Sequence, residues 1–192
     1  MLKCFARAIF SAFQVLMESP LSAWENFYVI VGSSAGALTG LQFVVMTLIS
    51  EGRITGSMSE IRAFGTPTIV HFCSSLLISA IMSSPWHTIS GAGLALSLCG
   101  VSGVIYAIRV VWHARRQTGY QPDKADLLWY VASPVVLNSA WAVSGFLLEQ
   151  QHASALFAIA AVALLLLFLG IRNSWDTVTY VALEHRKNKK KE

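Results

Sequence analysis

Four long stretches of the sequence contain no Asp, Glu, Lys or Arg: Asn26–Ser50, Ala63–Ile108, Leu127–Leu148 and Gln150–Ile171. A membrane-spanning helix needs about 20 consecutive, mostly apolar residues, and each stretch reaches that length. Charged residues make up 12% of the chain, whereas a soluble domain usually carries roughly 25%. These features exclude a soluble globular domain, a disordered chain and an extracellular disulfide-rich domain.

The second stretch is too long for one span, and the turn sequence Ser83-Ser84-Pro85-Trp86-His87 divides it. The sequence therefore predicts an all-α membrane protein, a bundle of about five transmembrane helices. Tryptophans lie near most of the expected ends, as is usual at the membrane–water interface. The expected spans are residues 27–49, 66–82, 91–112, 128–148 and 153–171.

The two ends of the chain differ from the bundle, which we place at residues 24–176. Residues 1–23 contain an apolar segment, Ala8–Met17, that is too short to cross a bilayer. We expect an amphipathic helix in the membrane interface there, with a cleaved signal peptide as the alternative. Residues 177–192 form a basic tail whose cations favour binding to anionic lipid over nucleic acid.

The positive charges are distributed unevenly between the two sides of the expected bundle. Loops 50–65 and 113–127, the inner end of the third span and the chain after the fifth span (172–192) together hold twelve Lys and Arg residues. Only Lys3 and Arg7 fall on the other side. Because cytoplasmic segments carry the excess of Lys and Arg, we predict a cytoplasmic C-terminus and an N-terminus outside.

Small residues recur at spacings of four in two expected spans. Gly32, Gly36 and Gly40 share one side of the first span, in the manner of a glycine zipper. The third span repeats the spacing with Ala95, Cys99, Gly103 and Ala107. Helices in lipid associate through close backbone contact, which small residues permit, so we predict helix packing here, within the chain or with a second protomer. The fifth span, aliphatic over Ala160–Leu169, is expected at the lipid-facing rim.

The second span carries a polar lane, by which we mean Thr68, His71, Ser75 and Ser79. Gln42 in the first span and Asn138 in the fourth lie at a similar depth, and Pro134 is expected to kink the fourth span. We expect a neutral His71 that hydrogen-bonds to Gln42 or Asn138. Hydrogen-bonded packing between helices explains such residues, and a hydrated path for an ion or small polar solute is the alternative.

Catalytic and metal chemistry find little support in the sequence. Gly32-Ser33-Ser34-Ala35-Gly36 matches GxSxG, but a nucleophile elbow needs a strand and a sharp turn, which a neutral helix does not supply. An intramembrane Ser34–His71 dyad would join residues expected at different depths. Ligation of haem or a metal by His71 lacks a second ligand at a suitable spacing, so we expect no cofactor and no enzyme activity.

Four short segments together resemble a family of small bacterial integral membrane proteins without an assigned function. They are Trp24-x-x-Phe27-Tyr28, Gly36–Val44, Thr66–Phe72 and Gly170–Asp176. The resemblance implies a helical bundle in the bacterial inner membrane and assigns no catalytic residue.

Two functions remain open from the sequence. The leading hypothesis is a small channel- or transporter-like protein, with oligomerisation possible. The alternative is a non-transporting scaffold or accessory subunit that binds another membrane protein. A water-filled path beside the polar lane would favour the first, and dry packing would favour the second.

Overall fold

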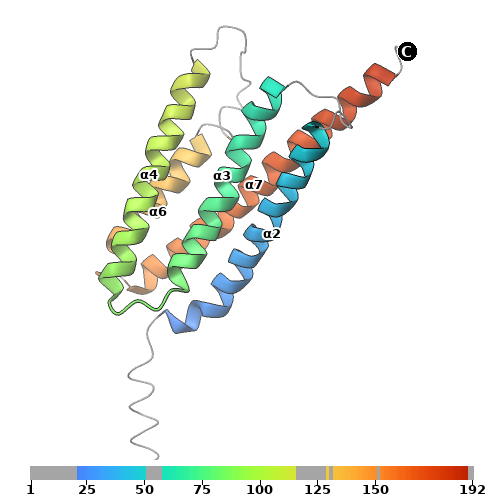
Figure 1. Ribbon diagram of the computed structural model, residues 1–192. Coiled ribbons are helices and arrows are strands. Elements are labelled where there is room, and N and C mark those ends of the chain that lie inside the picture. The colour runs from blue at the N-terminus through green and yellow to red at the C-terminus, as the bar shows by residue number, and fades with distance from the viewer. Residues whose placement is uncertain (1–20, 51–57, 116–128, 130–131, 151, 190–192) are drawn as a thin grey trace, which may run out of the picture.

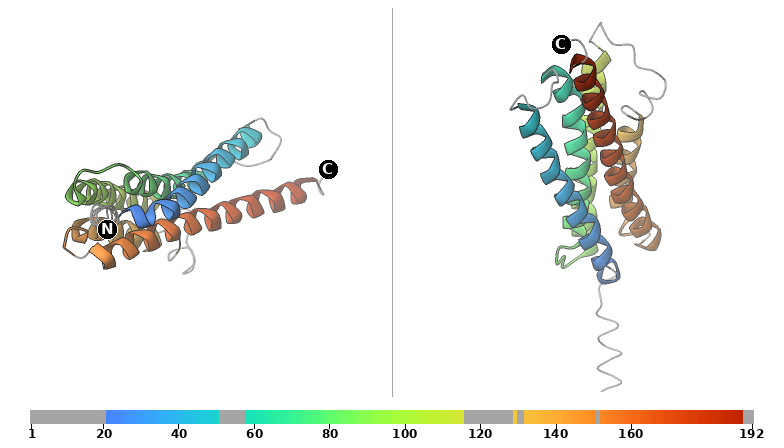
Figure 2. Two further views of the ribbon diagram at one scale, coloured as in Figure 1. Left: turned by 90° about the horizontal axis from the view of Figure 1, so that it is seen from below. Right: turned by 90° about the vertical axis from the view of Figure 1, so that its right-hand side faces the viewer.

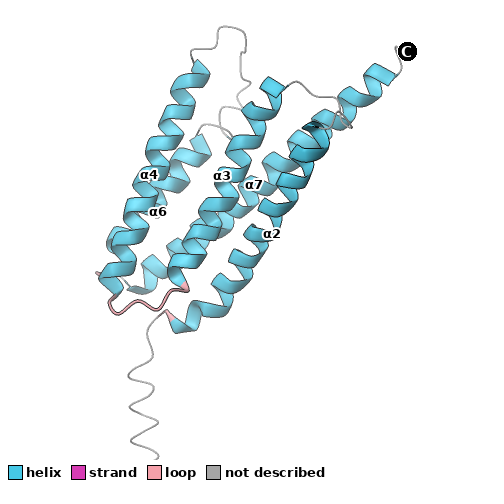
Figure 3. Cartoon of the chain, in the orientation of Figure 1, coloured by secondary structure: helices cyan, strands magenta, loops and turns pink. Residues whose placement is uncertain are grey.

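The computed structural model describes residues 21–50, 58–115, 129, 132–150 and 152–189, and every regular element among them is helical (Figure 3). The predicted interfacial helix at residues 1–23 lies almost wholly outside these residues. The elements are a short 3-10 turn η1 (Ser22–Trp24) and the helices α2 (Glu25–Ser50), α3 (Met58–Met82), α4 (Ile89–Arg115), α6 (Ser133–Leu147) and α7 (His152–Lys189).

The five helices run side by side, with α2, α4 and α7 pointing one way and α3 and α6 the other (Figure 1). Seen along the bundle, α3 and α4 form one layer and α6 and α7 another, with α2 beside α3 (Figure 2). The main contacts join α4 to α6, α3 to α7, α2 to α3, and α6 to α7. Although a short turn connects α3 to α4, these two helices touch only slightly.

Within the described residues, three helical segments are long and apolar enough to cross a membrane: Ser22–Thr47, Ile89–Trp112 and Ala153–Thr179. The apolar part of α3, Thr66–Met82, is shorter, and α6 has only 15 residues. The all-α membrane class is therefore supported by length and composition, whereas a bundle of five spans exceeds the three that meet this criterion.

The position of α7 corrects the expectation that the fifth span lies at the rim. In its most apolar window 56% of residues are buried, against 22% in α2 and 17% in α4. It packs against α3, α6 and α2, so it occupies the centre of the bundle. The Ala and Leu side chains that looked lipid-facing fill the core, because apolar packing and lipid exposure favour the same residue types.

Two prolines lie in described helices. Pro134 lies in the first turn of α6 and directly follows helical backbone, because Ala132 is π-helical. The kink expected at Pro134 stays a prediction. Pro67 lies inside α3, which begins nine residues earlier at Met58.

The turn between α3 and α4 forms where the sequence predicts it. The Ser84 hydroxyl donates to the Ala80 carbonyl at 2.7 Å, and the Trp86 indole N–H donates to the Ile81 carbonyl at 2.6 Å. These bonds satisfy carbonyls at the end of α3 that have no partner within the helix. The turn therefore ends α3 and reverses the chain into α4.

Candidate functional site

The polar lane of α3 faces the interior of the protein. Thr68, His71, Ser75 and Ser79 are all buried, with at most 4% of any residue exposed. The Ser75 hydroxyl donates to the Ala163 carbonyl of α7 at 2.9 Å, and the Ser79 hydroxyl donates to the Ser75 carbonyl at the same distance. The serine half of the lane therefore makes direct protein contacts, one of which joins two helices.

The other half of the lane belongs to a polar layer shared by three helices. Because α3 and α7 are antiparallel, the contacts of Ser75 with Ala163 and of Phe72 with Gly170 place Asn173 and Ser174 at the level of Thr68. The Ser174 hydroxyl donates to Gln42 Oε1 of α2 at 3.2 Å. We call the resulting group the polar layer: Gln42, Thr68, His71, Asn173 and Ser174.

His71 and Asn173 contain buried polar atoms that lack partners. His71 is 4% exposed and Asn173 is 1% exposed. Among the described residues, neither ring nitrogen of His71 and neither amide atom of Asn173 has a hydrogen-bond partner. An unpaired buried polar group costs about 1–3 kcal/mol. Such atoms mark either stored strain or a place where a small polar molecule can bind.

Asn138 does not join this layer, and the predicted hydrogen bond from His71 to Gln42 or Asn138 is not formed among the described residues. The Asn138 amide donates to the Pro134 carbonyl of its own helix at 2.7 Å, and its side chain lies against Gly103 of α4. The physical reason is the close packing of α6 on α4, which places the Asn138 side chain in that interface. Gln42 pairs with Ser174 instead of His71.

Glycines hold α4 and α6 very close together. A Cβ added to Gly100 would lie 2.5 Å from the backbone nitrogen of Ala142, and one added to Gly93 would lie 2.8 Å from the Gly145 carbonyl oxygen. Gly103 meets the Asn138 side chain in the same interface. Cys99, from the predicted stripe, packs half-buried against the core. The two helix backbones therefore touch along most of α6.

The glycines of α2 behave differently from one another. A Cβ added to Gly32 would lie 2.9 Å from Ser79 Cβ of α3. At Gly36 and Gly40 no described atom would lie within 4 Å of an added Cβ. Each step of four residues turns the helix surface by about 40°, so the stripe rotates away from α3 after Gly32. Among the described residues, Gly32 is therefore the only one of the three glycines that forms a close contact within the chain.

The described residues that were considered for catalysis or metal binding do not lie together in one site. The Ser34 hydroxyl donates to the Ile30 carbonyl at 2.8 Å, within a continuous helix that has no elbow. The Gly32–Ser79 contact places Ser34 about six residues, or roughly 9 Å, from the level of His71. In the part of the chain that the structure describes, no group of three His, Cys, Asp or Glu residues could hold a metal ion.

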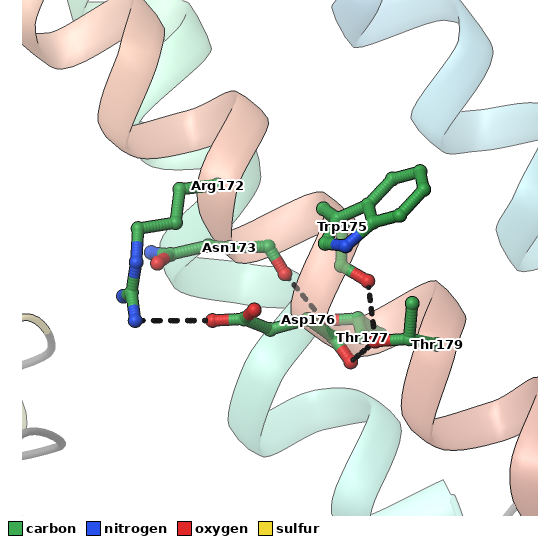
Figure 4. Close-up of polar contacts among 6 residues, drawn as sticks. All are labelled: Arg172, Asn173, Trp175, Asp176, Thr177 and Thr179. Atoms are coloured by element: carbon green, nitrogen blue, oxygen red, sulfur yellow. Dashed lines mark hydrogen bonds and ion pairs between the residues drawn. The ribbon is translucent and has the colours of Figure 1, made fainter.

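Arg172 forms a charged group beside the polar layer, at the end of the apolar part of α7 (Figure 4). Its guanidinium lies 3.6 Å from the Asp176 carboxylate and 4.3 Å from the centre of the Trp129 ring. The Thr177 hydroxyl donates to the Asn173 carbonyl at 2.8 Å one turn along the same helix. These local contacts link the polar layer to the charged end of α7.

Sequence reasoning did not select Asn173, Ser174 or the glycines Gly93 and Gly100. A signal for the first two exists, because polar residues directly after the longest apolar run must lie near a membrane boundary. The spacing of seven between Gly93 and Gly100 also keeps both on one helix face. The partner helix of each residue, however, follows only from the packing.

No protein-family model, curated protein or solved structure matches the chain. The functional argument therefore rests on the residues of this chain. The resemblance to small bacterial membrane proteins stays a prediction.

Proposed function

We propose that the protein is a membrane-embedded scaffold or accessory subunit that binds another membrane protein and has no solute path of its own. The observation that carries this proposal is the direct bond between the Ser75 hydroxyl and the Ala163 carbonyl, in a lane that is almost completely buried. Polar side chains that hold helices together in this way serve packing. This observation favours a scaffold or accessory subunit, which was the alternative from the sequence, over a channel- or transporter-like protein, which was the leading hypothesis.

The outer face of α2 carries small residues, which supports the binding of a partner helix there. Gly36 is half-buried and Gly40 is exposed, and the neighbouring Ala37 is exposed as well. Small residues on a membrane helix allow another helix to approach its backbone closely. A helix of another membrane protein, or of a second copy of this chain, would cover this face.

The experiment is a flux assay with purified protein in liposomes, under proton and potassium gradients between pH 5 and 8. A scaffold is expected to give the same leak as empty liposomes under every gradient. A specific flux that rises with protein content would overturn the proposal.

Transport is the second candidate, and the unpaired atoms of His71 and Asn173 favour it. A water molecule or a small polar solute would provide the missing hydrogen bonds. Histidine is also the side chain that changes charge most readily near neutral pH. On this alternative, His71→Leu abolishes a flux that the exposed turn variant His87→Leu retains.

We further propose a location in the bacterial inner membrane, with the C-terminus in the cytoplasm and the basic tail on anionic lipid. This orientation requires the C-terminus and the α3–α4 turn to lie on opposite sides of the membrane. In Figure 1 the C-terminal end of α7 lies at the opposite end of the bundle from that turn. In intact cells, Ser84→Cys should react with a membrane-impermeant thiol reagent and Thr118→Cys should not. The reverse labelling pattern would overturn this orientation.

A further inference from the structure

An apolar groove of about 600 Å³ runs between α6 and α7. Its walls include Val136 and Leu137 of α6 and Leu165 and Phe168 of α7. Val136, Leu165 and Phe168 are each more than half exposed, so the groove opens to the surroundings of the bundle. Its volume falls in the usual range for small-molecule sites and is too small for a helix about 10 Å wide.

One end of the groove is charged. Arg172 and Trp129 line it there, and the guanidinium stacks over the indole at 4.3 Å. Asp176 approaches Arg172 Nη2 at 3.6 Å, while the buried Nη1 has no hydrogen-bond partner in the described part of the chain. Figure 4 shows Arg172 and Asp176 on the same side of α7. The Arg172 side chain is 36% exposed, so part of the guanidinium stays accessible beside the Asp176 contact.

The position of Arg172 along α7 matches the boundary of a bilayer. It directly follows the uncharged run Gln150–Ile171, whereas Leu165 lies inside that run. At a rise of about 1.5 Å per residue, Leu165 and Arg172 are about 10 Å apart along the axis. The groove thus begins in the apolar zone and ends at the level where lipid headgroups lie.

We propose that this groove binds one anionic phospholipid, with an acyl chain along the apolar walls and the headgroup phosphate on the exposed part of the Arg172 guanidinium. The charge selects the occupant, because a guanidinium N–H donates a strong, charge-assisted hydrogen bond to a phosphate oxygen. The partly exposed pair with Asp176 is weak, so it does not prevent this contact. The site is separate from the basic tail and is compatible with either function proposed above.

The test measures lipid binding to the full chain in detergent by native mass spectrometry. The probes are phosphatidylglycerol and phosphatidylcholine with identical acyl chains. Wild-type protein is expected to bind phosphatidylglycerol more tightly. Arg172→Gln should weaken this binding roughly tenfold, as expected for loss of one charged hydrogen bond, and Arg172→Lys should retain part of the preference.

A matched pair of variants tests the acyl-chain part of the site. Val136→Trp should fill the groove and weaken binding of both lipids. Val143→Trp, at a position of α6 that is 55% exposed and outside the groove, should leave binding unchanged. Lys189→Gln, Lys190→Gln and Lys191→Gln combined should preserve the Arg172-dependent difference, because the tail is a separate surface.

Three results would overturn the proposal. Unchanged phosphatidylglycerol binding by Arg172→Gln would remove the headgroup contact. Equal effects of Val136→Trp and Val143→Trp would remove the groove as the acyl site. Displacement of the lipid by millimolar inorganic phosphate would show a plain anion site. Thermal unfolding of each variant confirms that it is folded, and Val136→Trp changes only an exposed position.

Discussion

The helix pairs α4–α6 and α2–α3 both contain glycines. Several glycines along the α4–α6 interface make close contacts, whereas in α2–α3 the close contact is at one end. At Gly93 and Gly100 an added Cβ would strike the backbone of α6. On α2 the contact with α3 is tight at Gly32 and absent at Gly36 and Gly40. Glycine at a regular spacing therefore shows where a helix can be approached, and the packing decides whether the same chain supplies the partner.

On the proposed function, the helix pairs α4–α6 and α2–α3 have separate tasks. In the α4–α6 interface Gly93, Gly100 and Gly145 are buried, and their close contacts hold the two helices together. On the proposed function, the outer glycines of α2 leave a face for a partner helix. Substitutions that distinguish these tasks are the sharpest tests of the comparison.

The largest effect is expected for Gly100→Leu. Its Cβ would lie 2.5 Å from the Ala142 nitrogen, and a helix backbone cannot move locally to make room. We expect a loss of about 3 kcal/mol in the free energy of unfolding, as for severe overpacking. Thermal unfolding in detergent measures it.

The control for this prediction is Gly36→Leu in the purified monomer. With open space around Gly36, the change should stay within about 0.5 kcal/mol, as is usual at surface positions. Equal losses in the two variants would refute the distinction between the pairs.

An intermediate effect, with the opposite sign, is expected for His71→Leu. Leucine removes two buried nitrogens that lack partners, so the stability should rise by about 1–2 kcal/mol. His87→Leu, on the exposed turn, is the control and should change little. Chemical unfolding of both variants gives the comparison. A loss of stability in His71→Leu would indicate that water bonds these nitrogens, which supports the transport alternative.

The smallest effect is expected for Ser75→Ala, which removes the bond between α3 and α7. Hydrogen bonds between membrane helices contribute about 0.6 kcal/mol on average, and we expect a loss of that size. Ser102→Ala is the matched control, because the Ser102 hydroxyl bonds only to Leu98 of its own helix and is exposed. Stability losses of the same size in both variants would show that the Ser75 bond contributes nothing between helices.

The sequence was sufficient to predict the helical class, the turn before α4 and the polar face of α3. These features depend on local composition and on helical periodicity, which a single chain displays directly. The central position of α7 could not be predicted, because its Ala and Leu residues suit both the core and lipid. The surroundings of Asn138 depend on the packing of α6 against α4, which no local pattern shows.

The partners of the polar layer show the same limit. Gln42 was recognised as a polar residue within a span, but its bond to Ser174 requires α2 and α7 to be neighbours. These residues are 132 positions apart in the chain. No local pattern encodes such a contact, so it could be found only from the packed structure.

Site-specific photo-crosslinking in membranes tests the central claim, that the outer glycine face of α2 binds another membrane protein. A photoreactive residue would replace the exposed Ala37 beside Gly36, and in a control it would replace Leu98, which is 60% exposed on α4. We predict one discrete protein adduct from position 37 that disappears in Gly36→Leu, and none from position 98. No protein adduct from position 37, or equal adducts from both positions, would contradict the account.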